Sequence, residues 1–393
     1  MTIIDRYLLK LFIKILAICF FSFTGLYIII DAFGNLDEFI EYGEQQDGIL
    51  PVMYDYYGAR VLSFFDRTSA VLTLVAAIFA ITWMQRNNEL TALMAAGINL
   101  RRIVKPLVLA VIVVSLLAVA NREFLIPSVR DKLSRNAQNW LGDAKQPLRP
   151  QFDHKTDILI GGQHTVAAEQ RIENPTFRCF TQYGSFGRQL VAENAVFFPR
   201  TNERPSGYLL EQVEVPENLH LYPSAFLQVK EKREPVILSP SDTPWLKDDQ
   251  LFVVSAVDFE HLANDSSLRQ HSSSMELMSG MRNASLDYGA DIRVTLHTRF
   301  LRPLLDATLL FLGLPLVLTR ENRNIFVAAG MCVSVVAVFF VVVLASHALG
   351  ASGILNPALG AWLPLIIFVP IAYGLADPLR AVKATEAAKH ANS

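Results

Sequence analysis

The clearest candidate for a specific interaction in this chain is a carboxylate, Glu89, which lies in a short segment between two long apolar runs. The same segment carries an apolar knob at helical spacing, made of Leu90, Leu93 and Met94. A carboxylate can pair with an arginine of a partner, and an apolar helix face can enter a partner's groove. The pattern therefore predicts a docking helix. It leaves open an amphipathic turn that lies on the membrane or on the chain's own helices.

The local sequence around Glu89 favours a helix. Residues 88–96 are mostly strong helix formers. Asn88 is a residue type that caps helix starts, and Gly97 is the type that adopts the left-handed conformation at helix ends. We therefore expect a short helix over about residues 88–96.

Motifs for catalysis or nucleotide binding are missing from the sequence. No GxxxxGK[ST] loop occurs that could bind ATP phosphates, and no HExxH, GxSxG or kinase signature occurs. The eight histidines are scattered without metal-ligand spacing, and the three cysteines form no CxxC motif. We therefore expect no catalytic residue, no metal site and no enzymatic activity in this chain.

Composition restricts the class of protein. Hydrophobic residues make up 52% of the 393 residues, charged residues make up 18%, and the formal net charge is −2. Globular proteins typically carry roughly 25% charged residues. The composition excludes a disordered tail protein, and the near-neutral charge gives no electrostatic footprint for nucleic acid.

Long apolar runs gather at the two ends of the chain. A run of about 20 apolar residues can cross the ~30 Å hydrocarbon core of a membrane as a helix. The first run is longer than a signal-peptide core of roughly 7–15 residues and is followed by an acidic residue, so we expect it to stay uncleaved. The six runs are residues 11–30, 64–84, 103–120, 304–318, 325–349 and 358–376. They predict six transmembrane helices, three on each side of a large insertion.

The distribution of charge predicts the orientation. Lysine and arginine gather before the first run, between the second and third, between the fourth and fifth, and after the sixth. The connection 31–60 instead carries seven acidic residues against one arginine. The positive-inside rule then puts both termini in the cytoplasm. The insertion faces outward, which in a two-membrane bacterium is the periplasm.

The insertion has the pattern of a β-domain. Short alternating or apolar stretches recur between turn signals, with no helical period. This favours an antiparallel sandwich or jelly roll over about residues 145–262. We expect residues 264–274, rich in Ser and Asn, to form a loop, and residues 275–303 to lead back to the membrane as a helix.

Six stretches resemble one known family. They are residues 3–10 (IIDRYLLK), 88–97 (NELTALMAAG), 121–127 (NREFLIP), 275–277 (MEL), 296–304 (LHTRFLRPL) and 312–316 (LGLPL). In this order, and with the three-helix, β-domain, three-helix layout, the chain resembles the LptF/LptG permeases of the lipopolysaccharide-export ABC transporter over nearly its whole length.

The resemblance implies the organisation of the chain. Residues 1–121 would hold the first three membrane helices and a cytoplasmic coupling helix at about 88–96. Residues 122–298 would form the periplasmic region with its β-jelly roll, and residues 299–393 the last three helices and a cytoplasmic tail. The protein would be a multi-pass protein of the bacterial inner membrane.

The resemblance also implies function and partners. The chain would pair with a second LptF/LptG-type permease around an apolar cavity and extract lipopolysaccharide or a related glycolipid. A periplasmic LptC/LptA-like β-bridge would receive the lipid. ATP and Mg would be bound by a separate LptB-like ATPase dimer, which Glu89 would contact, and this chain would bind no cofactor. The alternative function is a non-transporting, ATPase-coupled regulator of a periplasmic enzyme.

Such a function needs an apolar path and a site for headgroup phosphates. The expected path is one stripe of the first helix: Phe20, Phe23, Tyr27 and Ile30. Arginine can bind phosphate through two hydrogen bonds, and the expected headgroup candidates are Arg60, Arg67, Arg299 and Arg302. The alternatives are ordinary lipid-facing side chains for the stripe and membrane-interface anchors for the arginines.

Overall fold

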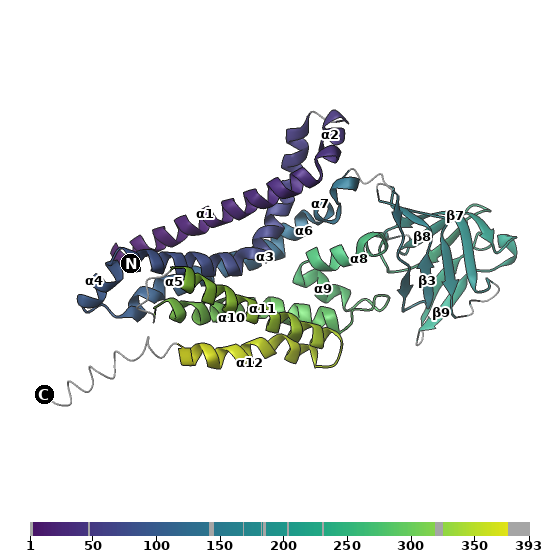
Figure 1. Ribbon diagram of the computed structural model, residues 1–393. Coiled ribbons are helices and arrows are strands. Elements are labelled where there is room, and N and C mark those ends of the chain that lie inside the picture. The colour runs from purple at the N-terminus through teal and green to yellow at the C-terminus, as the bar shows by residue number, and fades with distance from the viewer. Residues whose placement is uncertain are drawn as a thin grey trace. The chain divides into compact units, whose positions relative to one another are not determined.

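The computed structural model divides the chain into two compact units (Figure 1). The helical unit contains Met1–Ser128 and Gly289–Ser393, and the β-unit contains Val129–Tyr288. The structure describes residues 3–45, 48–140, 145–167, 169–181, 183, 186–202, 204–229, 232–318 and 325–375. The segments 319–324 and 376–393, which hold several of the basic residues used to predict the orientation, lie outside the described residues.

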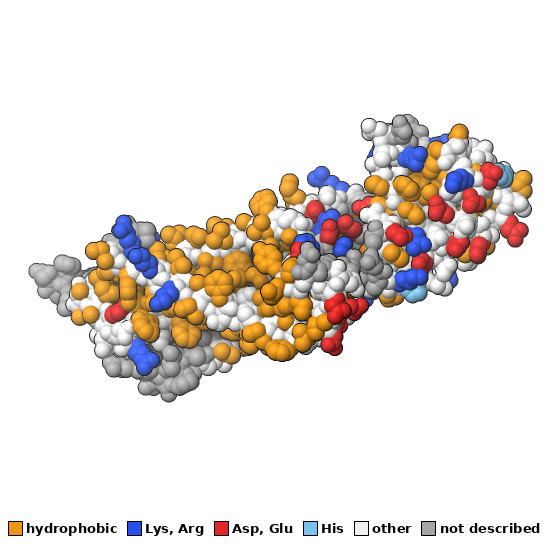
Figure 2. All heavy atoms as spheres, turned by 90° about the horizontal axis from the view of Figure 1, so that it is seen from above, with side chains coloured by type: hydrophobic (Ala, Val, Ile, Leu, Met, Phe, Trp, Pro, Cys, Tyr) orange, Lys and Arg blue, Asp and Glu red, His pale blue; other side chains and the backbone are white. Residues whose placement is uncertain are grey.

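Among the residues that the structure describes, six helices of the helical unit are long and apolar enough to cross a membrane. They are α1 (Ile3–Gly34), α3 (Ile49–Arg86), α5 (Leu100–Ala120) with its continuation, α10 (Ala290–Leu318), α11 (Ile325–Ala351) and α12 (Pro357–Leu375). Figure 2 shows hydrophobic side chains gathered over this unit. The six predicted membrane helices are confirmed, and most extend beyond the apolar runs because polar turns continue the same helix.

Burial differs strongly among these helices. Most residues in the apolar stretch of α10 are buried and few of those in α1 are, so α10 is central and α1 peripheral. The shared core includes Leu8 and Phe12 from α1, Ile81 from α3, Leu107 from α5 and Leu309 from α10. The outer faces of α1, α11 and α12 are left for lipid or for a partner.

The hairpin of α11 and α12 depends on two glycines. A Cβ atom on Gly360 would lie 2.9 Å from the Cα of Gly350 and 3.0 Å from the carbonyl oxygen of Ser346. No side chain fits into that gap, so the two helix backbones approach each other closely only because both positions lack one.

Short elements complete the helical unit. They are α2 (Leu36–Gln45), α4 (Glu89–Ala95), a π-helical turn η1 (Asn121–Leu125) and α6 (Ile126–Ser128). The turn η1 and α6 extend α5 without a break, so the third membrane helix reaches Ser128.

The β-unit contains an antiparallel sheet of eleven described strands. They are β1 (Gln146–Pro147), β2 (Gln151–Asp153), β3 (Ile158–Gly161), β4 (His164–Val166), β5 (Arg171–Glu173), β6 (Thr176–Cys179), β7 (Gln189–Phe198), β8 (Gly207–Val215), β9 (Ala225–Val229), β10 (Lys232–Leu238) and β11 (Leu251–Val254). The strand order is β1-β4-β5-β7-β8-β11-β10-β9, and β2, β3 and β6 form a branch that joins β7. The predicted inserted antiparallel β-domain is confirmed.

The alternation of apolar residues along the strands reflects which side chains face the core of the β-unit. On β7 every second residue is buried, except that two residues separate Ala192 from Ala195, close to a register shift between Val191 and Ala192. Tyr208 is fully buried, packs against Phe177 and Phe197, and donates from its hydroxyl to the carbonyl of Val257 at 2.8 Å. Aromatic side chains thus fill the centre of the domain.

The expectation of a loop over residues 264–274 is wrong. The helix α8 (Phe259–His271) covers most of it, and α9 (Ser274–Gly280) follows. Phe259 and Leu262 pack into the β-domain core, and this tertiary contact overrides the weak helix propensity of Ser and Asn. Ser273 and Glu276 then form a reciprocal capping box that starts α9. The other short helices are α7 (Arg130–Ser134), η2 (Ala137–Asn139) and η3 (Leu219–Leu221).

Candidate functional site

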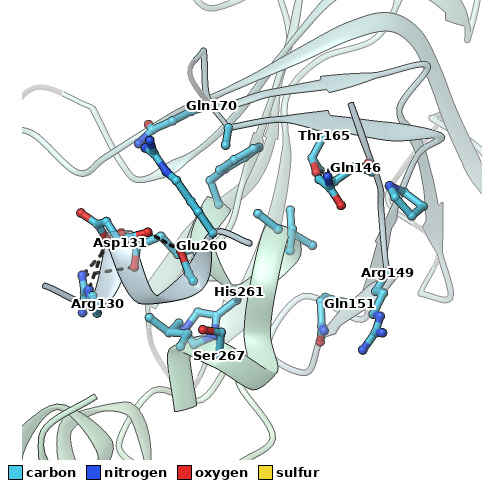
Figure 3. Close-up of a pocket in the computed structure, with 18 of the residues that line it drawn as sticks. Arg130, Asp131, Gln146, Arg149, Gln151, Thr165, Gln170, Glu260, His261 and Ser267 are labelled. Atoms are coloured by element: carbon cyan, nitrogen blue, oxygen red, sulfur yellow. Dashed lines mark hydrogen bonds and ion pairs between the residues drawn. The ribbon is translucent and has the colours of Figure 1, made fainter. Parts of the chain in front are cut away.

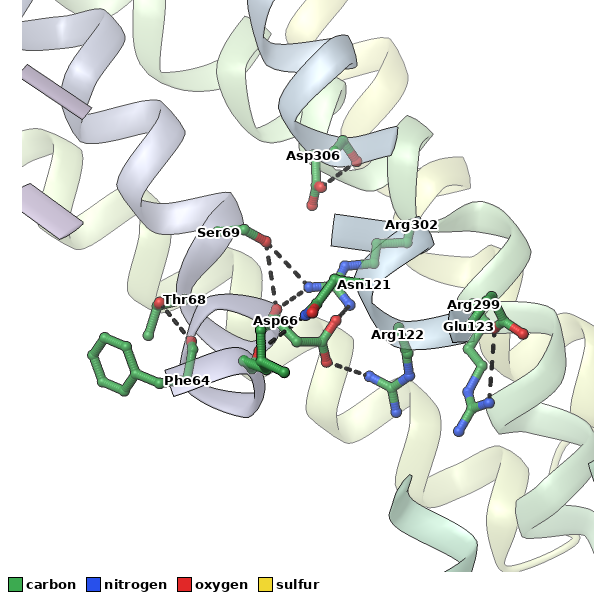
Figure 4. A network of polar contacts seen from close by, with 12 residues as sticks. Phe64, Asp66, Thr68, Ser69, Asn121, Arg122, Glu123, Arg299, Arg302 and Asp306 are labelled. Carbon is green, nitrogen blue, oxygen red and sulfur yellow. Dashed lines mark hydrogen bonds and ion pairs between the residues drawn. The ribbon is translucent and has the colours of Figure 1, made fainter. Parts of the chain in front are cut away.

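A buried carboxylate joins three membrane helices (Figure 4). Asp66 of α3 is only 4% exposed. Its Oδ1 lies 2.5 Å from Nη1 of Arg302 on α10, and its Oδ2 lies 2.7 Å from Nη1 of Arg122 on η1. One carboxylate therefore ties α3, α10 and the end of α5 together.

Further polar contacts surround this carboxylate. The second guanidinium nitrogen of Arg302 donates to the backbone carbonyl of Asp66 and to Oγ of Ser69. Asn121 donates to the carbonyl of Leu62 at 2.9 Å. These contacts involve both side chains and backbone carbonyls, and they offset part of the desolvation cost of burying the charged groups.

Two more acidic residues lie on the same three helices. Arg299, 8% exposed, lies 4.0 Å from Glu123. Asp306 is also buried and accepts a hydrogen bond from Ser115 at 2.6 Å. Asp66, Glu123 and Asp306 thus balance Arg122, Arg299 and Arg302 in formal charge.

The π-helical turn η1 carries two members of the cluster, Arg122 and Glu123, and begins with Asn121. A π-turn widens one helical turn and is frequent at functional sites. Its residues 121–125 fall within the stretch 121–127 that carried part of the family resemblance.

The predicted headgroup arginines fall into two pairs. Arg299 is buried beside the cluster, and the half-buried Arg302 already binds the Asp66 carboxylate. Arg60 lies with its guanidinium carbon 3.4 Å from the centre of the Tyr56 ring, whereas Arg67 is exposed. Arg67 makes no hydrogen bond or ion pair with the residues that the structure describes.

The four residues of the predicted apolar stripe on α1 have two different environments. Phe20 packs edge-on against Phe65 at 5.6 Å, and Tyr27 stacks on Phe64 at 5.4 Å. The other two positions, Phe23 and Ile30, are 51% and 65% exposed. The stripe therefore crosses the line where α1 meets α3: two members pack on α3 and two face outward.

An apolar groove lies along this line. It has a volume of about 400 Å³ and is lined by Ile13, Leu16, Ala17, Phe20, Phe21, Val61, Leu62 and Phe65. Arg60 directly precedes the groove residue Val61 on α3, and Arg67 follows the groove residue Phe65 by two positions. The groove can thus hold hydrocarbon with cationic residues close to its α3 wall.

The predicted docking helix forms as α4, over Glu89–Ala95. Gly97 has φ +79°, and the hydrogen bonds from Ile98 N–H to Leu93 O and from Gly97 N–H to Met94 O make a Schellman end. The prediction that Asn88 caps the helix start is wrong, since it adopts φ 57° and its side chain makes no capping bond.

The apolar knob is shared between the chain's own core and its surface. Leu90 is 4% exposed and belongs to the helical core, and Leu93 packs partly against it. Met94 is 47% exposed. Glu89 accepts a hydrogen bond from the hydroxyl of Tyr7 at 3.1 Å, and its Oε2 has no hydrogen-bond partner among the described residues. Packing in the chain's own helical core thus accounts for the apolar character of Leu90. Met94 lies on the exposed side of α4, where a partner could contact it.

The β-unit holds a cavity of about 520 Å³ between α7, α8 and strands β1, β2 and β4 (Figure 3). Arg130 on its wall lies 3.1 Å from Glu260 and 3.2 Å from Glu276. This arginine ties α7 to α8 and α9, so its charge is already neutralised by two carboxylates.

Asp66, Arg122, Asp306 and Ser115 were not predicted as site residues. The signal for two of them was present: Asp66 and Asp306 are acidic residues inside apolar runs, where ionisable groups are rare and functional by default. Nothing in the sequence indicated that Arg122 and Ser115 face these carboxylates.

Comparison with known proteins places the whole arrangement in one family. The model of the lipopolysaccharide export system permease LptF/LptG family matches residues 6–376. No curated protein matches the chain.

Proposed function

Because the chain belongs to the LptF/LptG family of lipopolysaccharide export permeases, we propose that it is one permease subunit of an ABC transporter that extracts lipopolysaccharide or a related glycolipid from the inner membrane. The family makes it a transporter component and a multi-pass inner-membrane protein. The family match over residues 6–376 is the observation that carries the proposal.

The groove between α1 and α3 is the proposed place of the acyl chains. Its lining is apolar, and Phe23 and Ile30 extend the apolar surface outward from it. Since acyl chains offer no hydrogen bonds, only an apolar wall leaves no polar group unsatisfied. Arg67, exposed next to the α3 residues of the groove, is the proposed first contact for a headgroup phosphate, with Arg60 about two helical turns away on the same helix.

The partners follow from the same proposal. A second LptF/LptG-type permease would cover the exposed face of α1, and an LptB-like ATPase dimer, which binds ATP and Mg, would contact α4 through Glu89 and Met94. Both termini would lie in the cytoplasm. The β-unit would lie in the periplasm and pass the lipid to an LptC/LptA-like β-bridge.

Reconstitution tests this function. Proteoliposomes that contain both permeases and the ATPase should release labelled lipopolysaccharide to a periplasmic acceptor only when ATP is present. The double variant Arg60→Ala, Arg67→Ala should slow release more than basal ATP hydrolysis, whereas Arg178→Ala on strand β6 serves as a matched control. ATP hydrolysis without any lipid release would favour the alternative, a regulator of a periplasmic enzyme.

A further inference from the structure

We infer that a second cavity in the β-unit binds a tetrahedral oxyanion, such as a phosphate group. The cavity has a volume of about 480 Å³. Its walls come from the turn after β2, the loop between β7 and β8, strands β9 to β11, and Ser285. It shares no lining residue with the cavity of Figure 3 or with the groove on α1.

The rim of this cavity is cationic. Lys155, Arg200 and Arg204 line it, and Glu234 is the one acidic lining residue in the part of the chain that the structure describes. Lys155 lies 2.5 Å from Glu234, and the Arg204 guanidinium lies 4.6 Å above the Trp245 ring. Stacking holds the guanidinium plane while leaving its N–H edge available. Among the described residues Arg200 has no hydrogen-bond or ion-pair partner, so the rim keeps a positive excess.

The wall contains two hydroxyl groups that lack partners. Thr156 and Ser285 are 5% and 0% exposed, and neither Oγ1 of Thr156 nor Oγ of Ser285 finds a hydrogen-bond partner among the described residues. A buried hydroxyl without a partner costs free energy, and native proteins normally complete it with a protein group, a water molecule or a ligand. A ligand oxygen that enters the cavity could accept from both hydroxyls after rotation about their χ1 bonds.

The carboxylate of Asp153, which lies near these hydroxyls, already has hydrogen-bond donors of its own. Asp153 is fully buried and accepts from Ser255 Oγ at 2.6 Å and from the backbone N–H groups of Lys155 and Thr156 at 2.9 and 3.2 Å. Ser255 also accepts from the N–H of Val257. With these acceptors occupied, the cavity offers mainly donors.

The hydrogen-bond donors and positive charges of the cavity wall indicate which class of ligand fits. A metal cation would meet three cationic side chains, and an apolar ligand would leave both hydroxyls unsatisfied. A phosphate group supplies negative charge and several acceptor oxygens, and arginine hydrogen bonds to phosphate are among the strongest in proteins. The cavity of Figure 3 differs, because Arg130 there already pairs with Glu260 and Glu276.

Titration calorimetry on the full chain tests the site. The protein is placed in nanodiscs of phosphatidylcholine and titrated with inorganic phosphate. We expect saturable binding, and the double variant Arg200→Ala, Arg204→Ala should weaken it by about tenfold or more, since each charge-assisted bond contributes roughly that factor. The exposed Arg178 on β6 gives the matched control, and Arg178→Ala should leave the affinity unchanged. No saturable binding by the native chain, or equal affinity in the two arginine variants, overturns the inference.

The hydroxyl groups give a second and independent readout. Ser285→Ala and Thr156→Val should each lower phosphate affinity severalfold without lowering the thermal unfolding midpoint, because each removes a buried hydroxyl that has no partner among the described residues. Unchanged affinity together with a lowered midpoint would show that the hydroxyls are satisfied inside the fold, and it would overturn the site.

The source of the phosphate is decided by competition. A phosphorylated glycolipid and its dephosphorylated form are added to the same nanodiscs before the phosphate titration. Competition by the phosphorylated form alone assigns the site to the headgroup of the proposed substrate, and this arm rests on the proposed function. Phosphate binding without such competition assigns it to a soluble phosphate ester. Neither arm uses the ATPase, so a failed transport assay and a failed binding assay remain distinguishable.

Discussion

Asp66 and Arg302 are 236 residues apart in the sequence, and their charged groups lie 2.5 Å apart between α3 and α10. Arg122 binds the other oxygen of the same carboxylate, so the second, third and fourth membrane helices meet at one residue. α10 belongs to the second half of the molecule in sequence, after the β-unit. This ion pair therefore directly links the membrane helices that precede the β-unit in the sequence with those that follow it.

Loss of the Asp66 carboxylate should destabilise the helical unit. Asp66→Asn leaves Arg302 and Arg122 with an uncompensated buried charge, which typically costs roughly 3–5 kcal/mol. The free energy of unfolding in detergent should fall by about that amount, and Glu41→Gln, an exposed carboxylate on α2, should leave it unchanged. A double-mutant cycle with Arg302→Gln should show a coupling of about 0.5–3 kcal/mol. Additive effects would mean that the two groups do not interact.

The two sides of α4 should respond differently to truncation. Leu90→Ala removes a buried core side chain and should lower the free energy of unfolding by about 2–5 kcal/mol. Met94→Ala changes an exposed side chain and should leave it unchanged while weakening copurification of the ATPase. The thermal unfolding midpoint and the amount of copurified ATPase are measured for both variants. Together they separate an effect on core packing from an effect on ATPase docking. Normal ATPase copurification by Met94→Ala and Glu89→Ala would contradict a docking role for α4.

The glycine contact between α11 and α12 predicts opposite effects at two positions of one helix. Gly360→Ala puts a Cβ 2.9 Å from the Gly350 backbone and should lower stability by about 1–3 kcal/mol. Gly374→Ala meets nothing within 4 Å and should raise it by about 0.4–1 kcal/mol, since alanine restricts the unfolded chain. Both are measured by unfolding in detergent, and the same sign at both positions would refute the close approach.

Burial of Cys179 makes one part of stability depend on pH. Burial raises the pKa of this thiol from 9.0 to about 11. The thiol therefore ionises at lower pH in the unfolded chain than in the folded one. Its full contribution to the free energy of unfolding is present below about pH 9 and is lost as the pH rises toward 11, by roughly 2–3 kcal/mol. Cys179→Ala should remove this slope between pH 9 and 11 in unfolding titrations.

The same burial controls the reactivity of the thiol. Since the thiolate is the nucleophile, iodoacetamide at pH 8.5 should label Cys179 only after unfolding. Mass spectrometry of the peptide that contains it provides the measurement. Equal labelling of folded and unfolded protein would show that the β-domain core opens.

Local patterns in the sequence are enough to predict several features of this protein. Six membrane helices follow from apolar runs long enough for a bilayer, because hydrophobic transfer depends on each segment's own composition. The inserted antiparallel domain follows from short alternating stretches between turn signals, and the left-handed end of α4 follows from Gly97. The ordered motifs sufficed to recognise the family that its model matches over residues 6–376.

Which of these residues face each other depends on how the helices and strands pack in three dimensions. Phe20 and Phe23 belong to one apolar stripe, yet one packs on Phe65 and the other is half exposed, because the edge of α3 runs between them. Arg302 forms an ion pair with Asp66, and Ser285 and Thr156 line one cavity of the β-unit, although each pair is far apart in the chain. Periodicity gives the direction of a side chain relative to its own helix or strand. The partner it meets is set by how those elements pack, and that information is not local in the sequence.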